Sequence, residues 1–274
     1  MSNPPKALLF DIGGVCVISP FQAILDYELA NAIPVGWINF SISRASPGGA
    51  WQRLERGECI LNDGFFAQFK ADLEVPSLWA EFWAKQPSSK TGPSAPPPVP
   101  QIDAKLLFWN MMRISRAPDP YMYPALHALR ESGRFLLAAL SNTVAFPDGI
   151  QDDRGTTFAA GLAFHPESPH VGDSRDISDR FDIFISSAHI GLRKPDARIY
   201  ELAVRELDRE SRRRGGDGVT AADVLFLDDI GANLKGARAV GMRTLKVELG
   251  RTEEAVRELE RATGLKLLGE KARL

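Results

Sequence analysis

The sequence has few cysteines, no long apolar run and no signal-peptide pattern at its N-terminus. Cys16 and Cys59 are the only two cysteines among 274 residues. They are too few for a disulfide framework and are typical of a reducing compartment. No apolar stretch approaches the roughly 20 residues that span a bilayer. We therefore expect a cytoplasmic protein that has no membrane partner.

The sequence also lacks a large excess of either positive or negative charge. The formal net charge is -2, so there is no global attraction to nucleic acid, and any anion-binding site has to be local. We therefore expect a small-molecule partner and no nucleic acid. The C-terminal triplet Ala272-Arg273-Leu274 resembles a variant of the Ser-Lys-Leu peroxisomal signal. A peroxisomal location is the alternative that this triplet leaves open.

The first apolar run leads directly into a carboxylate. Residues 7–10 are Ala-Leu-Leu-Phe, followed by Asp11 and by the glycines at 13 and 14. A short apolar run before a turn signal predicts a strand buried on both faces. Its C-terminal end is where open α/β sheets bind ligands, and there Asp11 could act as a nucleophile or as a metal ligand. Taken alone, an aspartate at such a place more often caps a turn.

The next hundred residues are helical in pattern. Apolar and aromatic residues recur at helical spacing over residues 20–85, and we expect most of these aromatics to pack inside a small helical bundle. Residues 87–101 are rich in proline and serine and predict a loop that packs no core. Helical periodicity resumes over residues 102–112.

From residue 119 the pattern changes to strands that alternate with helices. This alternation predicts a parallel sheet with right-handed crossovers. The predicted strands are 135–140, 181–186, 224–227 and 243–247, and the predicted helices are 123–131, 197–207, 232–240 and 252–263. Residues 208–218 read as a charged connection.

Residues 147–178 are rich in Gly, Asp, Ser and Pro, and their weak periodicity predicts a long surface excursion. His165, His170 and Asp173 lie within it and have a spacing compatible with a metal site. Scattered polar residues in a loop are more commonly just solvated, and we favour that interpretation.

Several predicted strands end in, or run shortly into, polar residues that suit phosphate chemistry. Asp11 could attack phosphorus, and Ser141 with Asn142 could donate hydrogen bonds to phosphate oxygens. Lys194 supplies a positive charge. Asp228-Asp229 gives the hard oxygen ligands that Mg²⁺ prefers. Such a cation and a lysine would offset the negative charge that develops during phosphoryl transfer.

Four segments resemble the motifs of the haloacid dehalogenase-like (HAD) superfamily. They are residues 10–15 (Phe-Asp-Ile-Gly-Gly-Val), 140–143 (Leu-Ser-Asn-Thr), 193–196 (Arg-Lys-Pro-Asp) and 227–233 (Leu-Asp-Asp-Ile-Gly-Ala-Asn). Within the superfamily, residues 228–235 and 253–268 look similar to the phosphatase domain of mammalian soluble epoxide hydrolase and to the HAD domain of an acyl-CoA dehydrogenase family member.

This resemblance implies an α/β fold in which a Rossmann-like parallel sheet core carries an inserted α-helical cap domain. The core would comprise residues 1–17 and 119–274, with the strand before Asp11 at its centre. The cap would comprise residues 18–118 and include the Pro-rich loop 87–101.

The resemblance also implies the roles of the site residues. Asp11 would be the nucleophile that forms an aspartyl-phosphate, and Lys194 would steady both nucleophile and phosphate. The Asp11 and Asp229 carboxylates and the Gly13 carbonyl would bind Mg²⁺. Ser141 and Asn142 would hold the phosphate, while Asp228 and Asn233 would support the metal site.

One position departs from the phosphatase pattern. Most phosphatases of this superfamily carry a second aspartate two residues after the nucleophile as general acid and base, and here that residue is Gly13. Losing a positioned acid–base group typically costs about 10²–10⁴-fold in rate. We expect a Mg²⁺-dependent phosphatase that acts on a small phosphorylated metabolite.

Two alternatives remain open at this point. One is a metal-independent haloacid dehalogenase, whose relatives also lack that second aspartate. Adjacent Asp228-Asp229 argues against it, because that chemistry needs no metal. The other is a weakly active protein that binds a phosphometabolite, which the glycine at position 13 motivates.

Overall fold

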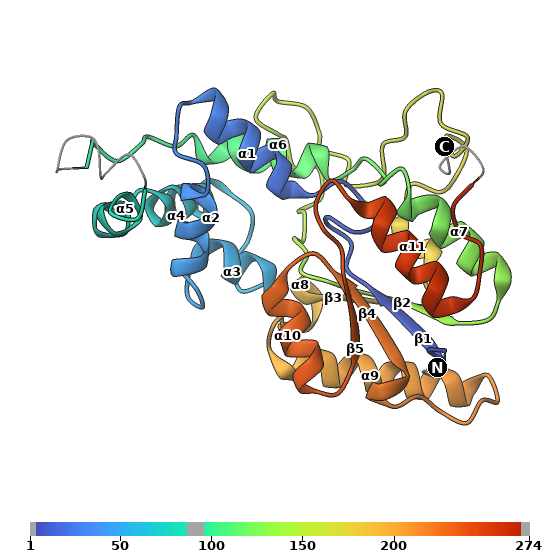
Figure 1. The fold of residues 1–274 in the computed structure, drawn as a ribbon. Helices are drawn as coiled ribbons and strands as arrows, with labels where there is room; N and C mark the ends of the chain where they lie inside the picture. Colours follow the sequence, from blue (N-terminus) through green and yellow to red (C-terminus); the bar gives the residue numbers. More distant parts are fainter. Residues whose placement is uncertain (1–3, 87–95, 270–274) are drawn as a thin grey trace.

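The computed structural model describes residues 4–86 and 96–269 of the chain. Its elements fall into two groups, an α/β unit built on one sheet and a group of helices next to one end of that sheet (Figure 1). The chain crosses from the first strand into the helical group and then returns to complete the sheet.

The sheet has five parallel strands in the order β3-β2-β1-β4-β5, so the first strand of the chain lies at the centre. Every residue of this central strand is fully buried. Phe10, its last residue, is in register with Ala139 on one side and Leu227 on the other. The strands are β1 (Ala7–Phe10), β2 (Leu136–Ser141), β3 (Ile183–Ser186), β4 (Val224–Asp228) and β5 (Arg243–Lys246).

Helices cover both faces of the sheet. The helical elements of this unit are α7 (Met122–Ser132), η2 (Ile177–Arg180), α8 (Ser187–Ile190), α9 (Ala197–Arg213), η3 (Ala221–Asp223), α10 (Gly231–Ala239) and α11 (Thr252–Thr263). Leu8 and Phe10 pack in one core with residues of α7 and α11, whereas Ala7 and Leu9 pack in another with residues of α9 and α10. This alternation is the period-two pattern of a strand covered on both faces. The predicted α/β fold is confirmed.

The second group consists of α1 (Pro20–Ala30), α2 (Trp37–Arg44), α3 (Ala50–Glu55), α4 (Asp63–Leu73), α5 (Pro76–Trp83) and α6 (Ala104–Ile114). The first of these begins at a proline, and the hydroxyl of Ser19 accepts a hydrogen bond from Phe21 N at 3.2 Å as its N-cap. These helices share a separate core rich in aromatics, in which Trp37 and Trp109 are fully buried. The expectation that most of these aromatics are core residues is therefore confirmed.

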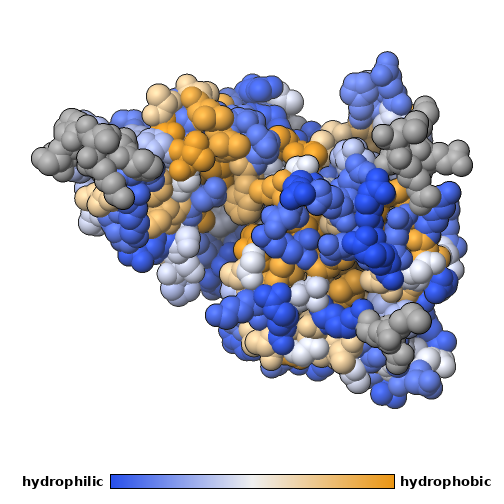
Figure 2. Space-filling model, in the orientation of Figure 1, coloured by the Kyte–Doolittle hydropathy of each residue, from blue (hydrophilic) through white to orange (hydrophobic). Residues whose placement is uncertain are grey.

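The surface of the helical group is partly apolar. Figure 2 shows hydrophobic residues gathered over α1, while hydrophilic residues dominate much of the α/β unit in the same view. Leu29 on that helix is 63% exposed. Within residues 4–86 and 96–269, none of the helices combines the length and apolarity that crossing a bilayer would require.

The structure corrects two sequence-based assignments. Residues 208–213, predicted as connection, continue α9, and Arg212 pairs with Asp208 one turn earlier along the helix. The short α8 was not predicted at all. Most of the predicted Pro-rich loop, residues 87–95, lies outside the described residues, and residues 96–101 form neither helix nor strand. Residues 147–176 also lack helix and strand, apart from an isolated bridge between Gln151 and Thr157.

Candidate active site

The C-terminal ends of three adjacent strands bring the predicted site residues together. Asp11 follows β1, Ser141 ends β2 and Asp228 ends β4. Because the strands are parallel, all three residues lie at the same edge of the sheet. Lys194 reaches this edge from the loop between α8 and α9. The ends of these strands face the group of helices α1–α6 (Figure 1).

Lys194 lies at the centre of the site and is 1% exposed. Its Nζ is 2.8 Å from Oδ1 of Asp11 and 2.7 Å from Oδ2 of Asp228. It also lies 5.3 Å from the ring centroid of Phe226. Burial lowers the pKa of this ammonium, but the carboxylates of Asp11 and Asp228 outweigh that effect and hold the pKa of Lys194 above its usual value.

The side chain of Asn142 holds the backbone of Lys194. Its Oδ1 accepts a hydrogen bond from Lys194 N at 2.8 Å, and its Nδ2 donates to Lys194 O at 3.2 Å. Both ends of the amide are therefore engaged by the backbone of the lysine that it orients. The predicted role of Asn142 in phosphate binding stays a prediction, and this arrangement adds a positioning role.

Asp228 is fully buried and surrounded by donors. Its oxygens accept hydrogen bonds from Ile230 N at 2.7 Å, from Nδ2 of Asn233 at 3.1 Å and from Nζ of Lys194 at 2.7 Å. The backbone carbonyl of Asn233 in turn accepts a hydrogen bond from the hydroxyl of Tyr200 at 2.9 Å. A carboxylate with this many partners is fixed in place and orients the lysine.

Asp229 differs from its neighbour because Oδ1 of Asp229 is buried without a hydrogen-bond partner among the described residues. Burial, and next the charge of Asp228, raise the pKa of Asp229 to about 7. Burial also raises the pKa of Asp11 well above its usual value, with Lys194 opposing the shift. Each of these acids is thus destabilised as an anion by its surroundings.

A divalent cation fits this donor set. Asp11, Asp228 and Asp229 each offer an oxygen, and the three oxygens lie within 4.8 Å of one another. The three carboxylates of the cluster and the ammonium that contacts two of them carry a formal charge of two negative units, which a divalent cation would balance. The unpartnered Oδ1 of Asp229 offers a free ligand atom. Hard oxygen donors of this kind suit Mg²⁺.

The two oxygens of Asp11 have different surroundings. Oδ1 accepts a hydrogen bond from Ile12 N at 2.7 Å and lies 2.8 Å from the ammonium of Lys194. Among the described residues, no hydrogen bond to Oδ2 is found. The carboxylate is therefore anchored by one oxygen and can present the other to a reactant.

Two glycines shape the loop after β1. An ideal Cβ on Gly14, whose φ is +77°, would lie 2.4 Å from Oδ2 of Asp229. An ideal Cβ on Gly13 would lie 3.3 Å from Cδ of Pro20, at the start of α1. Gly13 carries no acid–base side chain, and the ring of Pro20 lies close to where such a side chain would start.

Sequence reasoning missed a contact between the helices and the lysine loop. Arg193 places Nε 2.7 Å from Oε2 of Glu55 at the end of α3, and the hydroxyl of Ser187 donates to the carbonyl of Glu55 at 2.5 Å. Arg193 directly precedes Lys194, but Glu55 is 138 positions away in the sequence. No local signal in the sequence pairs these two residues.

Comparisons with known proteins agree with the resemblance seen in the sequence. No family model matches the chain. It is 28% identical over 272 residues, or 96% of its length, to acyl-CoA dehydrogenase family member 10 of Mus musculus. It is 38% identical over 260 residues, or 94% of its length, to bifunctional epoxide hydrolase 2 of Rattus norvegicus. The chain spans only 19% and 39% of these two relatives, respectively.

Among solved structures, the chain is similar to a protein of Porphyromonas gingivalis described as a predicted HAD-like family hydrolase. The TM-score is 0.52 at 17% identity, and the similarity covers 94% of this chain and 99% of the other. The parallel sheet, the strand order and this similarity agree with one another. The chain therefore has the haloacid dehalogenase-like fold that its four sequence segments predicted.

Proposed function

We propose that the protein is a Mg²⁺-dependent phosphatase that hydrolyses a small phosphorylated metabolite. The observation that carries the proposal is the cluster of three carboxylates, two of which contact one buried lysine, with an unpartnered oxygen on Asp229. This arrangement supplies a nucleophile, a fixed positive charge and a place for a dication at one sheet edge. Phosphoryl transfer relies on these three elements.

In this proposal Oδ2 of Asp11 attacks phosphorus, because Oδ1 is held by Ile12 N and Lys194. The P–O bond to the alcohol breaks, the phosphoryl group is carried on Asp11, and the alcohol oxygen takes up a proton from water. A water molecule then attacks phosphorus, which releases inorganic phosphate and restores the carboxylate. Lys194 compensates charge on Asp11 throughout both steps.

Asp11, Asp229 and the carbonyl of Gly13 would hold Mg²⁺, with Asp228 and Asn233 in support. When bound, the ion supplies charge stabilisation for the transferring group. Ser141, which ends β2 and is 4% exposed, would donate to the phosphate from the neighbouring strand. Because Gly13 lacks a side chain, the protein favours esters whose alcohol is a good leaving group.

We further propose that residues 18–118 act as a cap and that residues 1–17 and 119–274 form the catalytic core. Helices α1–α6 have their own hydrophobic core, separate from those of the sheet. They meet the site through α3, where Glu55 contacts Arg193 and Ser187. A substrate bound at the strand ends would therefore be covered by this group of helices.

The test is hydrolysis of p-nitrophenyl phosphate and a panel of phosphorylated metabolites, with Mg²⁺ and with EDTA. We expect turnover that needs Mg²⁺ and that disappears in Asp11→Asn. Asp26→Asn is a matched control, because Asp26 contacts Gln22 on the surface of α1. Turnover that persists in Asp11→Asn, or that ignores EDTA, would contradict the proposal. Chloride release from a haloacid without Mg²⁺ would instead indicate the dehalogenase alternative.

The missing side chain at Gly13 favours a second candidate function, binding of a phosphometabolite with little turnover. Calorimetric titration with inorganic phosphate and Mg²⁺ distinguishes the two functions. Binding to the wild type and to Asp11→Asn, together with negligible hydrolysis of every ester in the panel, would support the binding function. Efficient hydrolysis would exclude it.

A further inference from the structure

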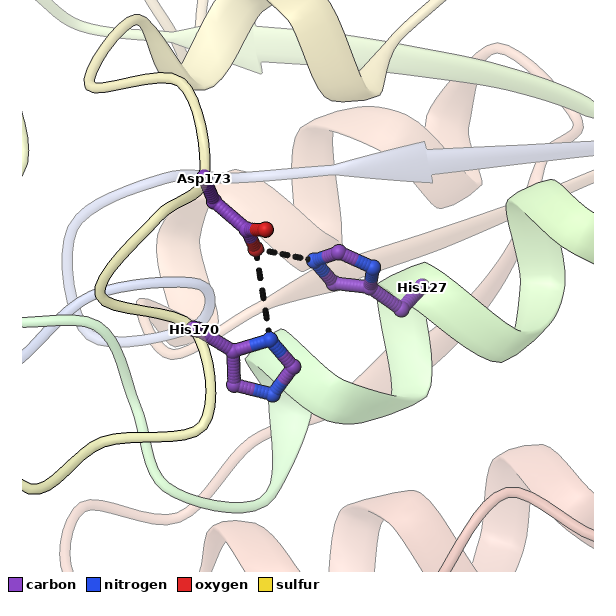
Figure 3. A group of neighbouring side chains, drawn as sticks. All are labelled: His127, His170 and Asp173. Carbon is purple, nitrogen blue, oxygen red and sulfur yellow. Dashed lines mark ion pairs between the residues drawn. The ribbon is translucent and has the colours of Figure 1, made fainter.

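A second cluster of potential metal ligands lies away from the strand-end site. His127 on α7 and His170 and Asp173 in the segment 147–178 turn their side chains toward one another (Figure 3). Oδ2 of Asp173 lies 2.7 Å from Nε2 of His127 and 3.2 Å from Nδ1 of His170. The segment was expected to leave His170 and Asp173 solvated. The fold instead packs them against a histidine that the sequence pattern did not single out.

We propose that His127, His170 and Asp173 form a binding site for a first-row transition-metal dication, with Zn²⁺ as the best match. Two imidazole nitrogens and one carboxylate oxygen are a donor set that suits Zn²⁺ rather than Mg²⁺. Ligands at about 2.0–2.1 Å from Zn²⁺ in a tetrahedron are roughly 3.3 Å apart. The ligand atoms here lie within 4.8 Å of one another, so a small outward shift would admit the ion.

The environment of His127 supplies an independent reason. Its Nε2 is buried and lies 2.7 Å from Oδ2 of Asp173, but this contact lacks the alignment of a good hydrogen bond. Coordination to a metal would give this nitrogen a well-aligned partner. The three side chains are 21–24% exposed, which leaves an open side for a water ligand.

Arg180 competes with the metal for Asp173. Its Nη2 lies 3.3 Å from Oδ2 of Asp173, and its guanidinium lies 5.7 Å from the ring centroid of Tyr123, whose hydroxyl also donates to Asp173 at 3.2 Å. A dication and a guanidinium on the same carboxylate oxygen repel each other. Metal binding therefore requires Arg180 to withdraw, and removing its charge strengthens binding.

The site would join α7 to a segment that has no regular secondary structure. Residues 158–176 contain neither helix nor strand, and Leu162 packs with Tyr123 and Val17 in a small core of its own. Ile12, whose N–H holds Asp11, packs against the same core. A metal between α7 and this segment would fix the layer of side chains behind the loop that follows β1.

The test is calorimetric titration of the 274-residue chain with ZnCl₂ in saturating Mg²⁺, repeated in Asp229→Asn to weaken the strand-end acids as a competing site. The chain has four histidines, so His165→Gln and His189→Gln are matched controls for His170→Gln and His127→Gln. We expect one Zn²⁺ per chain, weakened at least about tenfold in the His170 and His127 variants only. Arg180→Gln should tighten binding.

Thermal unfolding and Co²⁺ absorption provide further readouts that separate metal binding from a purely structural role. Zn²⁺ should raise the Tm of the wild type and of His165→Gln, but not of His170→Gln. Visible absorption of bound Co²⁺ should show imidazole ligation that is lost in His170→Gln. The proposal is wrong if the wild type takes up no Zn²⁺ here, if His170→Gln binds like the wild type, or if His165→Gln loses as much affinity.

Discussion

The carboxylate of Asp229 lies in the space that a side chain at position 14 would need. An ideal Cβ on Gly14 would be 2.4 Å from Oδ2 of Asp229, and the backbone there has a φ of +77°. The loop after β1 can therefore approach the end of β4 only because residue 14 has no side chain. This approach brings Asp11 and Asp229 into one site.

Replacing Gly14 with alanine should displace Asp229 and lower stability. Gly264→Ala is the matched control, because its φ is +68° but nothing lies within 4 Å of an added Cβ. The control should show only the strain of a left-handed residue, about 1 kcal/mol. Gly14→Ala should lose about 1–3 kcal/mol more through overpacking, and its Mg²⁺-dependent turnover should fall. Urea unfolding of both variants measures the difference, and equal losses would contradict the clash.

Stability without Mg²⁺ should fall as the pH rises. The pKa of Asp229 is about 7 in the folded protein, against about 3.9 for an aspartate in an unfolded chain. The folded state thus binds this proton more tightly than the unfolded chain does. The contribution of this proton to the free energy of unfolding is complete below about pH 4 and is lost as the pH rises from about 4 through 7. The full shift corresponds to at most about 4 kcal/mol.

Thermal unfolding between pH 5 and pH 8 in EDTA tests this dependence. Asp229→Asn should unfold at a more nearly constant Tm over that range, because the group that titrates is gone. Mg²⁺ should restore the wild-type Tm at pH 8 far more than at pH 5. If Asp229→Asn retains the full pH slope, the pKa of Asp229 does not cause it.

Removing the ammonium of Lys194 should leave an uncompensated cluster of buried carboxylates. Its Nζ contacts Asp11 and Asp228 within 2.8 Å, and both residues are buried. Breaking such a pair on one side typically costs about 3–5 kcal/mol. We expect Lys194→Met to be destabilised by this amount at pH 8 and by less at pH 5, where protonation relieves the repulsion.

The double variant Lys194→Met with Asp228→Asn provides the control for that prediction. It removes one buried charge of each sign, so its unfolding free energy should recover much of the loss. Both variants should lack phosphatase activity, because neither has the fixed positive charge beside Asp11. A double variant that is less stable than Lys194→Met would show that Asp228 stabilises the fold independently of the lysine.

Introducing an aspartate at position 13 should increase turnover if the ring of Pro20 is also removed. A Cβ on Gly13 would lie 3.3 Å from Cδ of Pro20, so the proline ring has to give way. We expect Gly13→Asp with Pro20→Ala to raise kcat by at least about tenfold, which is less than the roughly 10²–10⁴-fold of a well-positioned acid–base group. Gly13→Asp alone should gain less.

The dependence of the kcat increase on the leaving group tests whether the new aspartate acts as a general acid. An added general acid helps most when the alcohol leaves poorly, so the increase in kcat should be larger for an alkyl phosphate than for p-nitrophenyl phosphate. Pro20→Ala alone should show no gain with either ester. An equal increase with both esters would indicate that the aspartate does not act as the acid.

Much of the fold could be predicted because its signals are local in sequence. The apolar run before Asp11 predicts a buried strand, and the sheet places that strand at its centre. Ser19-Pro20 predicts the start of α1, where the cap is found. The α9 boundary was wrong because ion pairs such as Asp208–Arg212 extend a helix across a segment that reads as a charged connection.

The candidate site was predicted from residue types at strand ends, and the structure brings Asp11, Lys194 and Asp228 together. The features of the site that the sequence did not predict depend on contacts between distant segments. The two ends of the Asn142 amide bind the backbone of Lys194, 52 positions away. His127 reaches Asp173 only because the segment 147–178 folds back onto α7.

Arg193 and Lys194 are neighbours in sequence, but their side chains contact different parts of the fold. Arg193 is paired with Glu55 on α3, whereas Lys194 points to Asp11 and its backbone is held by Asn142. Any movement that carries α3 away from the sheet must break the arginine pair or pull on the peptide that carries the lysine. In the proposed cap arrangement, the arrival and departure of a substrate would therefore be mechanically linked to the position of the ammonium beside Asp11.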